Sequence, residues 1–389
     1  MLDLKISDSI YYIGVDDTDI DLFESQYIVP DGISYNSYLI LDDKIAIVDT
    51  VDKRKAQDWW TNLKNALDGK TPDYLIVHHM EPDHAGLIGE VVAKYPQLQL
   101  VATQKAINML SMFFDNVEFS NRCVVAAEGD FLELGKHRLQ FFHAPMVHWP
   151  EVMVTYDHYD KVLFSADGFG KFGALAHEDE WACEARRYYF NICGKYGVQV
   201  QALLKKASQL DIQTICPLHG PILKENLGYY IGLYDTWSRY APEVDGVLVA
   251  YASIHGNTAE VAHHLAEILK AKGAKKVAIT DLSRDDMAEA IEDAFKYSHM
   301  VVCAASYDAS VFPPMHDFLH HLKIKSYQRR KVGIVENGSW APCAGRIMSD
   351  MLGQMKMIDI VEPMVTIRAK MKATDIPALE ALADAMLAE

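Results

Sequence analysis

The sequence predicts an α/β protein with two domains. Its 389 residues exceed what one hydrophobic core usually supports. In the first part of the chain, short β-rich runs alternate with helical stretches, whereas the last part follows a stricter strand and helix alternation. Half of the residues are apolar and 23% are charged, so we expect globular domains without a long disordered segment.

The first domain shows an α/β pattern from Ser34 to about Ile215. Short apolar runs predict strands at residues 38–41, 45–48 and 74–77, and several of these runs lie close enough to form hairpin-like pairs. Residues 225–240 are expected to form a helix. Residues 241–246 contain the proline, glycine and acidic residues typical of a linker.

Beyond the linker, strands are predicted at residues 247–251, 276–280, 300–304 and 332–335. Helices are expected between them, one of them beginning near Thr258, and a last helix lies near the C-terminus. Regular βα alternation favours a doubly wound parallel sheet. We therefore predict two domains, residues 1–244 and residues 245–389.

Charge and composition indicate which classes of partner the protein is not expected to bind and where in the cell we expect it. The formal net charge, 37 minus 54, is -17, which would repel both nucleic acid and an anionic membrane surface. Residues 1–20 lack the basic start and apolar core of a secretory signal, and we find no segment suited to crossing a bilayer. The six cysteines include no C-x-x-C pair and are expected to be reduced, mostly core thiols, so we expect a cytoplasmic protein.

A cluster of potential metal ligands follows the apolar run at residues 74–77. His79, Glu81, Asp83 and His84 lie within six positions, in a segment that Pro82 and Gly86 predict to be a tight loop. Histidine and carboxylate side chains that converge in this way bind divalent transition metals, because burying such charge without a cation is costly. This segment therefore predicts a metal site.

Three further candidate ligands occur later in the chain, each after a strand-like run and beside proline or glycine. They are His148, Asp167 and His219. Loops at strand ends are where α/β scaffolds place their chemistry. A single histidine is more often a hydrogen-bonded residue than a ligand, and this is our interpretation of His78, His143, His158 and His177.

Three loops in the second domain follow three of the four predicted strands and are rich in small and polar residues. The first contains Ser253, Ile254, His255, Gly256, Asn257 and Thr258; the second contains Ser306, Tyr307, Asp308 and Ala309; the third contains Asn337, Gly338, Ser339 and Trp340. The first loop opens a helix, where hydroxyls and backbone N–H groups form a phosphate cradle. We therefore expect a phosphate-bearing cofactor here.

The ligand motif resembles the metallo-β-lactamase fold, whose binuclear members carry H-x-H-x-D-H followed by separate His, Asp and His ligands. Glu81 stands where the hydrolases have histidine, and H-x-E-x-D-H is the version found in flavodiiron proteins. A carboxylate there suits iron better than zinc. The resemblance implies an αβ/βα sandwich for the first domain, with two Fe ions.

The same resemblance implies a ligand assignment. One iron would take His79, Glu81 and His148, the other Asp83 and His219, and Asp167 would bridge the two. Family members differ over the histidine that corresponds to His84, so whether His84 binds iron stays open.

The three loops of the second domain resemble those of flavodoxin, which binds FMN. By that resemblance the first loop would hold the phosphate, Tyr307, Asp308 and Ala309 would line one side of the flavin ring, and Trp340 would stack on it. This chain departs from the pattern at His255, where tyrosine is common. The second loop also lacks the usual Pro-Thr, and Ala-Pro-Cys follows the tryptophan of the third.

The combined resemblance, from about Ile33 to the C-terminus, implies a flavodiiron oxidoreductase. FMN would pass electrons to the diiron site, which would reduce dioxygen to water, nitric oxide to nitrous oxide, or both, as detoxification in an anaerobic or microaerobic cytoplasm. The family pattern implies a head-to-tail homodimer or a dimer of dimers. A separate electron donor such as rubredoxin is expected. The preferred gas, the donor and the oligomer size are not predicted.

Two other functions compete with this one. A zinc hydrolase of the metallo-β-lactamase class would use a metal-bound hydroxide, but Glu81 and the flavodoxin-like tail speak against it. Alternatively, the chain is a flavodoxin-like carrier with a docking module in front. The complete set of inward carboxylates and histidines speaks against that.

Overall fold

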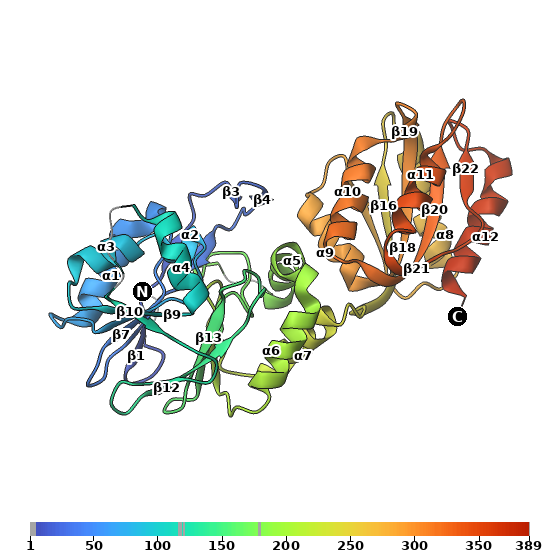
Figure 1. Ribbon diagram of the computed structural model, residues 1–389. Coiled ribbons are helices and arrows are strands. Elements are labelled where there is room, and N and C mark those ends of the chain that lie inside the picture. Colours follow the sequence, from blue (N-terminus) through green and yellow to red (C-terminus); the bar gives the residue numbers. More distant parts are fainter. Residues whose placement is uncertain (1–4, 116–118, 120, 178–179, 389) are drawn as a thin grey trace. The chain divides into compact units, whose positions relative to one another are not determined.

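The computed structural model describes residues 5–115, 119, 121–177 and 180–388. The chain forms two compact units, one made of Met1–Tyr189 and Val198–Tyr234, the other of Phe190–Gly197 and Asp235–Glu389 (Figure 1). The boundary that we predict between the metal domain and the cofactor domain, at residues 244 and 245, stays a prediction. Within the described ranges, no helix has both the length and the apolar character that a bilayer span requires.

The first unit contains two main sheets. The first sheet has the order β1-β6-β7-β8-β9-β10, namely β1 (Ile10–Tyr12), β6 (Tyr38–Ile40), β7 (Ala46–Val48), β8 (Tyr74–Ile76), β9 (Gln99–Ala102) and β10 (Cys123–Val125). The second has the order β11-β12-β13-β14-β15, namely β11 (Phe131–Glu133), β12 (Arg138–His143), β13 (Met153–Asp157), β14 (Val162–Phe164) and β15 (Thr214–Cys216). The strands predicted at residues 38–41, 45–48 and 74–77 are present within one residue at each end.

The core of the first unit lies between these two sheets. Tyr38, Val48 and Ile76 of the first sheet and Phe141 and Phe164 of the second belong to one buried apolar cluster. Alternate residues of a strand point to opposite faces of its sheet. The cluster therefore forms only when the apolar faces of both sheets are turned toward each other. The sandwich therefore fixes the relative positions of the loops at the strand ends.

Helices and two short strand pairs complete this part of the chain. The helices are α1 (Ala56–Leu67), α2 (Pro82–Ala85), α3 (Ile88–Lys94), α4 (Gln104–Phe113), α5 (Trp181–Ile192), α6 (Gly197–Ala207) and α7 (Leu227–Ser238), with 3-10 turns η1 (Lys53–Lys55) and η2 (Gly194–Tyr196). Strand β2 (Val15–Asp17) pairs with β5 (Ile33–Tyr35), and β3 (Leu22–Phe23) pairs with β4 (Tyr27–Ile28). Helix α1 shows why the helices pack, because Trp59, Leu63 and Leu67 recur every four residues and are buried.

The second unit is built on a sheet of order β17-β16-β18-β20-β21, with β22 also paired to β20 and β19 paired to β18. The strands are β16 (Val244–Ala252), β17 (Val277–Asp281), β18 (Tyr297–Tyr307), β19 (Ser310–Val311), β20 (Gln328–Asn337), β21 (Lys356–Ile360) and β22 (Val365–Ile367). All pairs are parallel except β18 with β19. Counted from β16, this is the 2-1-3-4-5 order of flavodoxin-like sheets.

Helices flank this sheet, as Figure 1 shows. They are α8 (Asn257–Ala271), α9 (Met287–Lys296), α10 (Pro313–Ile324), α11 (Ala344–Leu352) and α12 (Ile376–Leu387), with a 3-10 turn η3 (Ala373–Asp375). Leu265 of α8 and Leu382 of α12 are buried in one core cluster with Val249 and Val301 of the sheet. The predicted fold class, a sandwich domain followed by a doubly wound parallel sheet, is confirmed.

The linker is shorter than the sequence predicted, because residues 244–246 belong to β16. Val244 pairs with Tyr297, and the register shifts before Val247. The glycine that suggested a linker has a packing role instead: a Cβ at Gly246 would lie 2.8 Å from the side chain of Lys276. Glycine inside a strand often marks such an irregularity.

The core of the second unit gives a first prediction. Replacing the fully buried Leu265 by alanine removes apolar contacts with α12 and the sheet and should cost about 2–5 kcal/mol of local stability. Hydrogen-exchange mass spectrometry should show faster exchange in peptides from β16 and β18. Glu267→Ala on the same helix, where the side chain is 71% exposed, should leave exchange nearly unchanged. Equal exchange in the two variants would contradict this packing.

Candidate metal centre and cofactor pocket

The segment after β8 carries His79 out of the sheet and into a short helix. Pro82 occupies the first turn of α2, where its fixed φ suits a helix start, and Glu81 directly precedes it. The predicted tight loop is therefore a single helical turn. A Cβ at Gly86 would lie 2.7 Å from the Pro82 carbonyl oxygen and 2.9 Å from that of Val51, so glycine allows the turn to pack closely.

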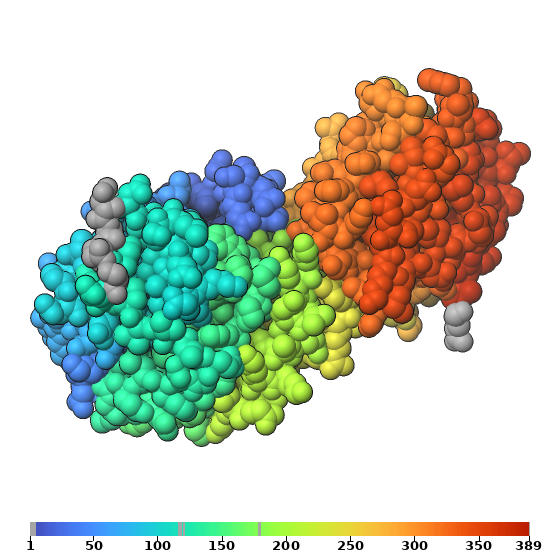
Figure 2. Space-filling model, in the orientation of Figure 1, coloured from blue at the N-terminus to red at the C-terminus, as the bar shows by residue number. Residues whose placement is uncertain are grey.

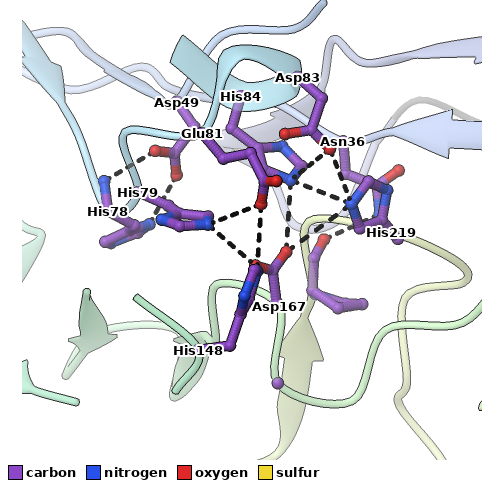
Figure 3. A network of polar contacts seen from close by, with 12 residues as sticks. Asn36, Asp49, His78, His79, Glu81, Asp83, His84, His148, Asp167 and His219 are labelled. Carbon is purple, nitrogen blue, oxygen red and sulfur yellow. Dashed lines mark hydrogen bonds and ion pairs between the residues drawn. The ribbon is translucent and has the colours of Figure 1, made fainter. Parts of the chain in front are cut away.

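The other predicted ligands come from three separate connections. His148 lies between β12 and β13, Asp167 follows β14 and His219 follows β15. Figure 3 shows His148 and Asp167 pointing toward His79 and Glu81, and it shows His219 pointing toward Asp83 and His84. The sandwich thus brings together residues separated by up to 140 positions in the sequence.

The seven predicted ligands form two groups in space. One group contains His79, Glu81, His148 and Asp167; the other contains Asp83, His84 and His219. Within each group, the potential ligand atoms all lie within 4.8 Å of one another. His84, which the sequence left open, has its Nε2 atom 3.0 Å from the Nε2 atom of His219. Its imidazole is therefore turned into the site.

Asp167 faces both groups at once. Its Oδ2 atom lies 3.4 Å from His79 Nε2 and 3.2 Å from His148 Nε2. Its Oδ1 atom lies 3.3 Å from His84 Nε2 and 3.7 Å from His219 Nε2 (Figure 3). A carboxylate in this position can bind two cations, one through each oxygen.

The polar atoms of the site fit a metal cation better than they fit one another. Both carboxylate oxygens of Asp83 and Asp167, and Nε2 of His148, are buried without a hydrogen-bond partner among the described residues. Leaving buried carboxylates unsatisfied is costly, and such groups are rare in native proteins. The donor set of imidazoles and carboxylates suits divalent transition metals, including iron.

The electrostatics of the site also favour positive charge. Burial raises the pKa of Asp83 to about 7, and the carboxylates of Glu81 and Asp167 add to the rise although His84 opposes it. Burial acts against the protonated form of His148, yet Asp167 and Glu81 raise its pKa to about 9. The crowded carboxylates therefore attract positive charge, as protons or as metal cations.

Contacts behind the ligands orient two of the imidazoles. The Nδ1–H group of His79 donates to Glu151 Oε1 at 2.8 Å, and that of His219 donates to the Ser34 carbonyl oxygen at 2.7 Å. In both rings this leaves Nε2 directed into the site. Our sequence analysis missed Glu151, although a carboxylate three residues after His148 was a usable signal.

The loop that carries His219 is held by the segment after β5. The Asn36 side chain donates to the carbonyl oxygens of Pro217 and Gly220, both at 2.8 Å. Gly220 N–H donates to Ser34 Oγ at 2.7 Å, and the positive φ of Gly220, 77°, lets the chain turn there. The backbone on either side of His219, at Pro217 and Gly220, is therefore held in place by the side chains of Asn36 and Ser34.

Glu24 is a second acidic residue that the sequence analysis missed. It lies at the tip of the β3–β4 hairpin, which stands at the surface of the first unit (Figure 2). Desolvation and then the charge of Glu81 raise the pKa of Glu24 to about 7, which puts Glu24 close to the first group. Its distance from the H-x-E-x-D-H motif in the sequence left no pattern that would have identified it.

The histidines interpreted as hydrogen-bonded residues lie outside both groups. His78 is fully buried, with Nδ1 2.7 Å from Asp49 Oδ2 and Nε2 2.6 Å from Thr155 Oγ1. Both ring nitrogens are therefore used within the protein. His143, His158 and His177 likewise belong to neither group.

A third cluster of metal-binding residue types has a different character. It contains His137, Asp157 and Asp160. His137 Nδ1 lies 2.9 Å from Asp157 Oδ2, its Nε2 lies 2.7 Å from Ser9 Oγ, and Asp157 also accepts from the Asp160 backbone N–H at 3.0 Å. Because these groups satisfy one another, the cluster fits a structural network that joins the N-terminal segment to the second sheet.

The second unit has a cavity of about 750 Å³ at the carboxyl ends of β16, β18 and β20. In a flavodoxin-like sheet, ligands bind at this edge, where the strand order reverses between β16 and β18. The lining residues are Ser253, Ile254, His255, Asn257, Thr258, Ala305, Ser306, Tyr307, Asp308, Ala309, Asn337, Gly338, Ser339, Trp340, Ala341, Cys343, Arg346 and Ala369. Of the residues predicted to bind the cofactor, only Gly256 is outside this set.

The first loop has the features of an anion site. Gly256 precedes α8 with a φ of 90°, and no side chain caps the helix start. Ser253 Oγ accepts the Gly256 N–H at 3.1 Å and so tightens the loop. A helix N-terminus without a side-chain cap offers its N–H groups and the positive end of its dipole to a phosphate. Gly256 thus shapes the first loop without lining the cavity.

The second and third loops are tied together by one hydroxyl. Ser306 Oγ accepts the backbone N–H groups of Cys343 at 2.9 Å and Ala344 at 3.1 Å. Trp340 is 83% exposed and Tyr307 is 44% exposed, so two large aromatic rings stand at the mouth of the cavity. Exposed aromatic rings beside a cavity are suited to stacking on a flat ligand. Arg346 adds a cation that the sequence analysis missed.

This chain is similar to known proteins in sequence and in fold. Residues 33–220 match the family described as "ODP family beta lactamase". A nitric oxide reductase from Moorella thermoacetica is 29% identical over 384 residues, which cover 96% of this chain and 95% of that protein.

Solved structures match over nearly the whole chain. The rubredoxin oxygen:oxidoreductase of Desulfovibrio gigas has a TM-score of 0.90 at 23% identity and covers 98% of this chain and 97% of its own. The flavodiiron protein of Giardia intestinalis has a TM-score of 0.89 at 22% identity and covers 98% of this chain and 95% of its own. This chain is therefore similar in sequence to a nitric oxide reductase, and it shares its two-domain fold with these two solved structures.

Proposed function

We propose that the protein is a flavodiiron oxidoreductase that reduces dioxygen to water, nitric oxide to nitrous oxide, or both. The observation that carries the proposal is the position of Asp167, whose two oxygens face two separate groups of buried, unsatisfied ligands. Two metal cations held by these groups would supply a centre at which a small gas could be reduced. The names of the relatives, a nitric oxide reductase and a rubredoxin oxygen:oxidoreductase, support the same chemistry.

In this proposal the ligand side chains hold two irons. His79, Glu81 and His148 would hold one, and Asp83, His84 and His219 would hold the other, with Asp167 placed to serve both. Bound iron and flavin together supply reversible one-electron chemistry. Dioxygen takes up four electrons and four protons to give two waters, whereas two nitric oxide molecules take up two electrons and two protons to give nitrous oxide and one water.

The cofactor of the second unit is proposed to be FMN. Ser253, His255, Asn257 and Thr258 would bind the phosphate at the start of α8, where the backbone N–H groups favour an anion. The loops that Ser306 ties together would hold the ring on both sides. A zinc hydrolase has no use for such a site, so the cavity supports the oxidoreductase over that alternative.

The resemblance to these relatives supports a proposal for partners and assembly. A separate carrier such as rubredoxin would deliver electrons, and the relative from Desulfovibrio gigas carries that donor in its name. We propose a head-to-tail homodimer or a dimer of dimers, in which the flavin of one chain serves the irons of another. We also propose a cytoplasmic protein that removes dioxygen or nitric oxide under anaerobic or microaerobic conditions.

The metal assignment predicts a loss of bound iron in one variant. Asp167→Ala removes the carboxylate that both groups share, so we expect the bound iron to fall from about two ions per chain to one or fewer. Elemental analysis after anaerobic reconstitution measures this. The exposed His158→Ala in the same unit serves as the control and should keep the wild-type iron content. Wild-type iron content in Asp167→Ala would refute the shared ligand.

The cofactor assignment predicts weaker flavin binding in Ser306→Ala. This change removes the acceptor that joins the second and third loops, so the Kd for FMN should rise about tenfold, or about 1.4 kcal/mol. Flavin fluorescence titration of the apoprotein gives the value. Ser283→Ala, which removes a hydroxyl without a hydrogen-bond partner among the described residues and outside the cavity, is the matched control. Unchanged FMN affinity in Ser306→Ala would argue against this loop arrangement.

The activity itself is tested by mixing reduced, iron-loaded and FMN-loaded protein with each gas separately. We expect flavin absorbance to return rapidly with dioxygen, nitric oxide or both, and we expect His79→Ala to slow this return by at least about 100-fold while FMN stays bound. Stopped-flow absorbance is the measurement. If the purified protein holds zinc, lacks flavin and oxidises with neither gas, the hydrolase is the better assignment.

A further inference from the structure

The two metal groups are chemically matched in the residues that face the cations. Each contains two histidines and one carboxylate of its own, and Asp167 is shared. Ligand type therefore gives no reason for the two positions to differ in affinity. A difference must come from groups behind the ligands, which set the basicity and orientation of an imidazole.

Behind His79 lies a buried carboxylate. Glu151 is 1% exposed, and its Oε1 atom accepts both His79 Nδ1–H at 2.8 Å and the backbone N–H of Met80 at 2.9 Å. Oε2 has no hydrogen-bond partner among the described atoms. Among the side chains, the Glu151 carboxylate therefore interacts mainly with the His79 imidazole.

Glu151 is itself held firmly in place. Its backbone carbonyl oxygen accepts Thr103 Oγ1–H at 2.9 Å, and the same hydroxyl oxygen caps α4 by accepting the Ala106 N–H at 3.1 Å. Thr103 is buried. A carboxylate fixed in this way orients the imidazole in front of it without a cost in side-chain entropy at the time of metal binding.

Among the described residues, no such carboxylate lies behind the histidines of the second group. His219 Nδ1–H donates to a neutral backbone carbonyl, that of Ser34, at 2.7 Å. His84 Nδ1 is buried without a hydrogen-bond partner in the described part of the chain. An imidazole that donates to a carboxylate is a stronger electron donor than one that donates to a carbonyl or to nothing.

We propose that Glu151 is a positioning residue that makes the two metal positions unequal, so that the His79–Glu81–His148 position binds its divalent cation first and more tightly. The inference rests on the proposed function, because it takes the two groups to be metal sites. It adds an order of loading and names the residue that sets it. Loss of an outer partner of this kind typically costs 10- to 100-fold in metal affinity.

His78, the residue directly before His79, provides a matched control. Asp49 is a buried carboxylate whose Oδ2 atom lies 2.7 Å from Nδ1 of His78, and its Oδ1 atom accepts the His78 backbone N–H at 2.7 Å. This copies the Glu151 contact. The Nε2 atom of His78, however, faces Thr155 and not the metal groups. Asp49→Asn therefore tests the loss of a buried carboxylate on a histidine that binds no metal.

The experiment is an anaerobic titration of the metal-free, FMN-loaded full chain with Co²⁺, whose visible absorption reports each binding step. Wild type should bind in two steps of different affinity. In Glu151→Gln, which keeps the size and the acceptor oxygen, the first dissociation constant should rise about 10- to 100-fold while the second changes by less than about threefold. In Asp49→Asn both constants should stay near wild type.

A second measurement needs no variant. Anomalous diffraction from wild-type protein loaded with about one equivalent of Co²⁺ should find the cation in the His79–Glu81–His148 group. Equal occupancy of the two groups, unchanged constants in Glu151→Gln, or the same loss in Asp49→Asn would overturn the inference. If wild type binds no Co²⁺ pair at all, the proposed function fails instead, and the two failures are thereby distinguished.

Discussion

The cost of burying carboxylates without partners is the constraint on which the first unit depends. Asp83 and Asp167 lie in the interior with no hydrogen bond to either oxygen among the described residues, and four imidazoles surround them. Only a strong positive charge can make this arrangement stable. The contrast with the cluster of His137 and Asp157 is instructive, because that cluster contains the same residue types but satisfies itself through hydrogen bonds. Buried polar atoms without hydrogen-bond partners therefore distinguish the candidate metal site from this cluster more clearly than residue composition does.

The second unit meets a different constraint, that of a parallel sheet. Parallel strands place all their carboxyl ends at one edge, and the reversal of strand order between β16 and β18 opens a cavity there. Loops distant in sequence must then be held together. Ser306 does this with one hydroxyl, and Asn337 exchanges two hydrogen bonds with the backbone of Ala369. The glycine before α8 leaves the helix start open for an anion.

Much of this could be predicted from the sequence, because its signals are local. Strand patterns and the spacing of H-x-E-x-D-H need only neighbouring residues, and the ordered ligands after them reinforce the pattern. What could not be predicted is set by packing between distant segments. His84 turns inward because α2 and the β15 loop meet, and Glu24 and Glu151 come near the site through other strands. Gly246 was misread because a glycine in a bulged strand has the same local pattern as a linker.

The wide sequence separation of the ligands has a consequence for biosynthesis. His219, the last of them, is held by Ser34 and Asn36 near the beginning of the chain, so the site cannot close until both ends of the sandwich have left the ribosome. A nascent chain that ends after the H-x-E-x-D-H segment would offer four of the seven predicted ligands, without Asp167. In the proposed function, complete metal binding would therefore come late, after His219 has been synthesised, and would accompany the final closure of the site.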